Sequence, residues 1–127
     1  MPNAPLTLIG RILLALIFLL AGGAKLADPA GTAGYFGSVG LPVPSLMAWL
    51  VGLFEIIGGL AILIGFQTRI AAVLLALFCV ASAFIGHFDP ENQMQMQAFM
   101  KNLAIAGGFL VLVAAGPGKL SIDGRAV

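Results

Sequence analysis

The chain contains four apolar runs of about twenty residues, which extend over residues 6–26, 45–66, 69–88 and 98–116. A helix of that length crosses the roughly 30 Å of hydrocarbon in a lipid bilayer. Transmembrane β-strands would instead alternate apolar and polar residues in segments of about ten, a pattern that the sequence lacks. The sequence therefore predicts an all-α fold, a membrane-embedded four-helix bundle formed by one domain over residues 1–127.

The composition agrees with a membrane environment. Hydrophobic residues make up 61% of the 127 residues and charged residues only 9%, whereas soluble domains carry about 25% charged residues. The formal net charge is +1, so the chain has no basic field with which to hold nucleic acid. We therefore expect the lipid bilayer, and no nucleic acid, among its partners.

Proline, aspartate and glycine mark the breaks between the runs. The longest break begins at Asp28-Pro29 and contains four glycines, and shorter breaks fall at residues 65–69, 89–90 and 116–118. Within the longest break, four apolar residues predict a short interfacial helix on the mouth of the bundle. They are Tyr35, Phe36, Val39 and Leu41.

The first run shares one property with a secretory signal peptide, because the small residues 21–24 follow an apolar stretch. A signal peptide carries its positive charge ahead of the apolar segment, whereas Arg11 lies inside this one. We therefore expect the first run to be a retained span.

The distribution of basic residues predicts the orientation. With four spans, both termini and the turn at Arg69 lie on one side of the membrane. That side has more basic residues than the other: Arg11, Arg69, Lys119 and Arg125 against Lys25 and Lys101. The positive-inside rule then predicts that both termini are cytoplasmic.

Ionisable residues at membrane depth are costly and therefore mark functional candidates. Glu55 lies about halfway along the second run, and Gly52, Gly58 and Gly59 share its helix face. Small residues at this spacing allow another helix to approach closely. The Glu55 face is therefore expected to point into the bundle.

Arg11 and Lys25 lie near opposite ends of the first run, and fourteen residues of helix leave them only about 40° apart around its axis. Arg11 and Glu55 differ in depth by roughly 9 Å, which the long arginine side chain can largely span. This predicts a buried Arg11–Glu55 ion pair. Its role is left open between fixing the helix register and handling a proton or ligand.

A second polar group is expected at the mouth of the bundle on the side away from the termini. His87 ends the third run, Lys101 and Asn102 open the fourth, and Lys25 ends the first. Together these residues are candidates for binding an anion, a quinone carbonyl or a phospholipid headgroup. The alternative is that the charged side chains only extend to the membrane interface.

The sequence offers little support for a metal site or a reactive thiol. His87, Asp89 and Glu91 precede three methionines, but methionine commonly fills apolar gaps, so no metal site is predicted. A haem would need His/Met ligation, since the chain has one histidine. Cys79 is the only cysteine and lies among apolar residues, which is typical of an inert core thiol.

Several of these residues together resemble the sequence pattern of the DoxX family of small bacterial membrane proteins. The matching segments are Gly10-Arg11, Ala24-Lys25-Leu26, Glu55-x-x-Gly58-Gly59, His87, and Phe99-Met100-Lys101-Asn102-Leu103 with Gly107-Gly108. The resemblance covers nearly the whole chain and implies a four-helix protein of the bacterial inner membrane. Founding relatives resemble small subunits of a thiosulfate:quinone oxidoreductase, and others are linked to membrane oxidoreductase assemblies handling thiol or oxidative stress.

The resemblance favours a quinone-interacting subunit of a membrane oxidoreductase system, with quinone as the candidate cofactor and a soluble or membrane oxidoreductase as partner. Two alternatives stay open: a non-catalytic membrane anchor or assembly factor, and a small transporter or lipid-binding module. A homo-oligomer is compatible with each. The sequence does not decide whether the chain is itself an enzyme, because it shows no cysteine pair and no flavin or metal motif.

Overall fold

A computed structural model describes residues 3–125, which form six helices. In chain order they are α1 (Ala4–Ala27), α2 (Pro29–Ser38), α3 (Pro44–Ile64), α4 (Thr68–Gly86), α5 (Gln93–Ala115) and α6 (Ile122–Arg125). Helices α1, α3, α4 and α5 are long and apolar enough to cross a membrane. The predicted all-α membrane fold is therefore confirmed.

The limits of the long helices lie within two residues of the predicted spans, except at the start of α5. This helix begins at Gln93, five residues earlier than predicted. The side chain of Asn92 accepts a hydrogen bond from the backbone N–H of Gln95 at 3.1 Å and so caps the helix. The cap allows a polar first turn, which hydropathy alone excludes from the span.

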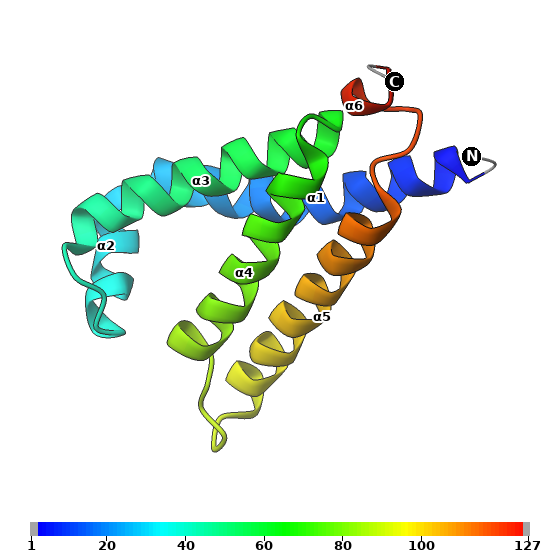
Figure 1. Cartoon of the computed structure of the whole chain (residues 1–127). Helices are drawn as coiled ribbons and strands as arrows, with labels where there is room; N and C mark the ends of the chain where they lie inside the picture. The colour runs from blue at the N-terminus through cyan, green and yellow to red at the C-terminus, as the bar shows by residue number, and fades with distance from the viewer. Residues whose placement is uncertain (1–2, 126–127) are drawn as a thin grey trace.

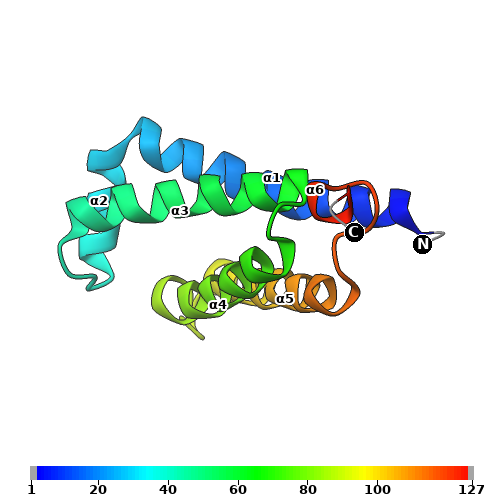
Figure 2. The same cartoon turned by 45° about the horizontal axis from the view of Figure 1, so that its top comes forward.

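The four long helices form two antiparallel hairpins arranged as two layers (Figures 1 and 2). One layer contains α1 and α3, and the other contains α4 and α5. The layers lie close together at the α3–α4 turn and diverge toward the opposite end, where α2 lies beside α3 (Figure 1). Both termini lie near the α3–α4 turn, so we call this the terminal end and the other the loop end.

Glycines bring α1 and α3 into close contact. A Cβ atom added at Gly22 would lie 2.8 Å from the backbone oxygen of Gly52, and one added at Gly52 would lie 2.7 Å from a methyl group of Leu26. Neither position has room for a larger side chain. Of the glycines predicted to share the face of Glu55, Gly52 and Gly59 therefore pack on α1, whereas Gly58 faces Leu75 on α4. Glu55 is only 4% exposed, as expected for an inward-facing residue.

Buried side chains lie between the layers, and long apolar side chains cover the outside. Phe18, Leu75 and Phe109 belong to the core, whereas Leu13 and Leu77 on the outer faces are 65% and 63% exposed. Such a surface is stable when lipid covers it. The arrangement is that of a bundle solvated by a bilayer.

Arg11 anchors the terminal end. Its guanidinium is 1% exposed and donates hydrogen bonds to four backbone carbonyls. The acceptors are Ile62 and Leu63 at the end of α3, and Pro117 and Leu120 in the C-terminal segment, at 2.7–3.1 Å. Arg11 therefore fastens α1, α3 and the C-terminal segment together.

The C-terminal segment also caps α4. The Asp123 carboxylate accepts hydrogen bonds from the backbone N–H groups of Gln67 and Thr68 and from the Thr68 hydroxyl. Burial opposes ionisation, but these hydrogen bonds and the nearby Arg11 charge hold the pKa of Asp123 below its ordinary value. We call Arg11 together with residues 116–123 the terminal clamp.

The predicted Arg11–Glu55 ion pair is wrong. Arg11 lies level with Ile62, whereas Glu55 is seven residues nearer the start of α3, a distance of about 10 Å at 1.5 Å per residue. The carbonyls at the end of α3 have no partner within their own helix. They lie nearer to Arg11 and satisfy its N–H groups.

Candidate ligand pocket

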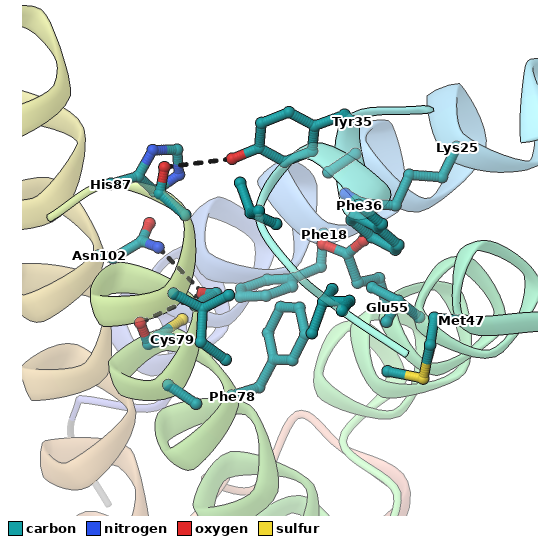
Figure 3. Close-up of a pocket in the computed structure, with 18 of the residues that line it drawn as sticks. Phe18, Lys25, Tyr35, Phe36, Met47, Glu55, Phe78, Cys79, His87 and Asn102 are labelled. Atoms are coloured by element: carbon teal, nitrogen blue, oxygen red, sulfur yellow. Dashed lines mark hydrogen bonds and ion pairs between the residues drawn. The ribbon is translucent and has the colours of Figure 1, made fainter. Parts of the chain in front are cut away.

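A cavity of about 460 Å³ lies between the two hairpins. Its lining comes from all five helices α1–α5 and from the residues that follow α2 and α4. The volume is within the usual range for small-molecule pockets, about 300–1,000 Å³. Figure 3 shows the cavity with α4 and α5 on the left and α3 on the right. This cavity is the candidate functional site.

The charged group of the cavity is an ion pair between α1 and α3. The Nζ atom of Lys25 lies 2.7 Å from Oε1 of Glu55. Close packing at Gly22 and Gly52 makes this contact possible, because it brings the two backbones together beside the pair. Apart from this ion pair, the buried Oε1 atom of Glu55 has no hydrogen-bond partner within residues 3–125. Glu55 Oε2 and the Lys25 ammonium group make no other side-chain hydrogen bond in that part of the chain.

The opposite wall carries a neutral polar group (Figure 3). The side-chain amide of Asn102 on α5 donates to the Ser82 hydroxyl on α4 at 3.1 Å. Ser82 in turn donates to the backbone carbonyl of Cys79 at 3.3 Å. These bonds satisfy Ser82, whereas Asn102 keeps its carbonyl oxygen and one N–H group for another partner.

Two contacts define the mouth of the cavity at the loop end. Nδ1 of His87 lies 2.8 Å from Oε1 of Gln95, so this ring nitrogen donates and Nε2 of the neutral ring is an acceptor. The Tyr35 hydroxyl donates to the backbone carbonyl of Gly86 at 3.2 Å. This second bond joins α2 to the end of α4 (Figure 3).

Aromatic rings form much of the remaining wall. Phe18, Phe36 and Phe78 line the cavity, and Phe18 also stacks at a tilt on Phe109, with centroids 5.5 Å apart. Aromatic faces of this kind suit a flat apolar ring. The cavity as a whole can therefore hold an apolar ring whose polar substituents meet Lys25–Glu55 on one side and Asn102 on the other.

The structure brings the four candidate ligand-binding residues around this one cavity. His87, Lys101, Asn102 and Lys25 all line it, although Lys101 is exposed and makes no hydrogen bond within the described part of the chain. Glu55 joins this group through Lys25, whereas Arg11 belongs to the terminal clamp. Their role in binding a ligand stays a prediction.

Sequence reasoning did not identify Ser82 and Gln95 as parts of the site. Ser82 is a polar residue within an apolar run, and this signal is available from the sequence. Gln95 lay outside the predicted fourth span, so its helical position facing His87 was not expected. A short helix, α2, is present in the predicted break and contains Tyr35 and Phe36, but it ends before Val39 and Leu41. All four residues line the cavity, and the position of α2 at the membrane interface stays a prediction.

The fold and the cavity define a class: small four-span membrane proteins with an apolar, ligand-sized pocket between two helix hairpins. The family model described as DoxX matches residues 6–88. The chain belongs to the DoxX family, as the sequence resemblance implied.

Similar proteins support this membership. "Inner membrane protein YqjF" of Escherichia coli is 46% identical over 91% of this chain and 88% of its own length. "Inner membrane protein YphA" of Escherichia coli is 39% identical over 94% and 89%, respectively. "Putative oxidoreductase CatD" of Bacillus subtilis is 40% identical, over 60% of this chain and 55% of its own length.

No solved structure matches the chain significantly. The relatives and the four long apolar helices identify the chain as an integral protein of the bacterial inner membrane, which confirms the expected localisation.

Proposed function

We propose that this DoxX-family protein is a quinone-interacting subunit of a membrane oxidoreductase system. The observation that carries the proposal is the cavity of about 460 Å³, which combines aromatic walls with polar groups on two opposite sides. A quinone head group has the same distribution, since its flat ring carries oxygen atoms at opposite positions. Lys25 and the Asn102 amide are the donors for these oxygens.

The position of the cavity within the membrane supports a lipophilic ligand. Its lining comes from the long apolar helices, and a ligand with an isoprenoid tail reaches such a site from the bilayer. The relative named "Putative oxidoreductase CatD" supports a role in an oxidoreductase system. Electrons would then be exchanged with a partner oxidoreductase, of the thiol, sulfur or oxidative-stress type that the family resemblance implies.

Mass spectrometry of the organic extract tests this proposal. The protein is purified from bacterial membranes in mild detergent, and its quinone content per chain is measured. We expect close to one quinone per chain in the wild type. Val51→Trp should reduce this content at least tenfold, because Val51 lines the cavity and the indole would occupy it.

Leu53→Trp is the matched control. Leu53 lies on the same helix but faces away from the cavity and is 44% exposed, so the same substitution should leave the quinone content unchanged. Equal loss in both folded variants, or no quinone in the wild type, would contradict the proposal. Co-purification of an enzyme without any small molecule would favour the membrane anchor or assembly factor instead.

A further inference from the structure

The polar groups of the cavity distinguish between two oxidation states of the same ligand. A quinone oxygen is a carbonyl and only accepts hydrogen bonds, whereas a quinol oxygen is a hydroxyl and both donates and accepts. The question is therefore whether the cavity offers donors alone, or a donor and an acceptor together.

The Lys25–Glu55 pair offers both. The two side chains meet at 2.7 Å through Glu55 Oε1, which leaves Oε2 as an acceptor beside the remaining N–H groups of Lys25. A hydroxyl placed here donates to Glu55 and accepts from Lys25. A carbonyl would use only Lys25 and would leave Glu55 Oε2 without a hydrogen-bond donor, which is unfavourable beside an apolar ligand.

The opposite wall offers the same combination. Because Ser82 already donates to the Cys79 carbonyl, Asn102 must act as the donor in its contact with Ser82. Its carbonyl oxygen remains an acceptor and its second N–H a donor. This neutral amide can therefore hold a ligand oxygen of either form, by donating to a carbonyl or by bonding to a hydroxyl.

His87 at the mouth of the cavity does not enter this comparison. Its Nδ1 atom is engaged by Oε1 of Gln95 at 2.8 Å, and the two ligand oxygens are assigned to Lys25–Glu55 and to Asn102.

We propose that the cavity binds the quinol form in preference to the quinone, with Lys25–Glu55 and Asn102 each holding one hydroxyl and Glu55 providing the discrimination. This inference rests on the proposed function, since it assumes a ligand of the quinone class. It adds the oxidation state that the site retains and the residue that selects it.

Equilibrium binding of a short-tailed ubiquinone analogue tests the inference. The purified full-length protein is titrated in detergent with the oxidised analogue in air and with the reduced analogue under anaerobic conditions, and heats of binding are measured. We expect the quinol to bind about tenfold more tightly than the quinone, the effect of one additional hydrogen bond to a charged group.

Glu55→Gln should abolish the preference. A glutamine amide offers an N–H to a carbonyl as readily as an oxygen to a hydroxyl, so the two forms should bind within about twofold of each other. A double variant, Lys25→Gln with Glu55→Gln, removes both charges and covers the case in which an unpaired Lys25 destabilises the fold. Glu91→Gln, the same change on an exposed loop residue, is the matched control and should keep the preference.

The possible outcomes separate the two proposals. Equal or tighter binding of the quinone by the wild type overturns the quinol preference and leaves the quinone-interacting function in place. A preference that persists in folded Glu55→Gln or in the double variant overturns the role of Glu55. Absence of binding by either form overturns the proposed function itself.

Discussion

The bundle contains one buried charged residue at its terminal end and another about halfway along α3, and the two differ in how completely the protein satisfies their hydrogen bonds. At the terminal end Arg11 donates to four backbone carbonyls and Asp123 accepts three hydrogen bonds. In the cavity Glu55 has the single partner Lys25. Both glutamate and arginine are at least 95% buried, so burial alone does not distinguish them.

Ionisable residues within a membrane bundle therefore fall into two kinds. A charge most of whose donors or acceptors are used by the protein holds the structure together. A charge that borders a cavity and keeps an unused atom is available to a ligand. By this criterion the terminal clamp is structural, whereas the Lys25–Glu55 pair belongs to the candidate site.

Removal of the Arg11 side chain should have the largest effect on stability. Arg11→Met leaves the carbonyls of α3 and of the C-terminal segment without a donor, so we expect the free energy of unfolding to fall by about 3 kcal/mol or more. Denaturation by SDS in mixed micelles measures this change. Arg69→Met is the matched control, because Arg69 is exposed and makes one hydrogen bond, to Val113, and should cost about 1 kcal/mol. An equal loss of unfolding free energy in the two variants would contradict the structural role of Arg11.

Ligand binding by the same variant tests whether the terminal clamp affects the cavity. Folded Arg11→Met should bind the quinone analogue with wild-type affinity, since Arg11 does not line the cavity. A large loss of affinity in the folded fraction would show that the terminal clamp influences ligand binding in the cavity.

A substitution that separates α1 from α3 should have an intermediate effect on the free energy of unfolding. A Cβ at Gly22 meets the Gly52 backbone oxygen at 2.8 Å, so Gly22→Ala should cost about 1–3 kcal/mol of stability and weaken ligand binding by separating Lys25 from Glu55. Gly23→Ala is the control, because nothing lies within 4 Å of its added Cβ. It should be neutral or slightly stabilising, since alanine favours helix. Equal effects of the two substitutions would contradict the packing argument.

Removal of the Asp123 cap should have the smallest effect on the free energy of unfolding, and this effect should depend on pH. Asp123→Asn removes a charged cap from the start of α4 and should cost about 1 kcal/mol at neutral pH. Because folding lowers the pKa of Asp123, its contribution is present above the ordinary aspartate pKa and is lost as the pH falls through the lower folded value. Unfolding measured from neutral to acidic pH should therefore show the wild type and the variant converging below about pH 4. A constant difference in stability would refute this assignment.

Sequence alone located the spans because hydropathy is a local property. The predicted limits of α1, α3 and α4 are nearly those observed, and the inward direction of Glu55 followed from the spacing of Gly52 and Gly59. Among the long helices, the capped polar turn at Asn92 was missed, since a side-chain cap overrides hydropathy there. The short helix α6 was not predicted either.

The partners of the charged residues were not predictable in the same way. They depend on the relative register of two helices, and a shift of seven residues separates the expected partner of Arg11 from the observed one. The acceptors of Arg11 are backbone carbonyls at the end of α3 and in residues 116–120. Every residue type has such a carbonyl, so the sequence does not show which of them will bind Arg11. The same register explains why Lys25, assigned to the mouth, lies against Glu55.

The terminal clamp also has a consequence for folding during synthesis. Arg11 lies in α1, yet one of its acceptors, Leu120, lies 109 residues later in the chain. At about 5–20 residues per second, synthesis of that interval takes on the order of ten seconds. The full set of Arg11 hydrogen bonds therefore forms only after Leu120 has been made.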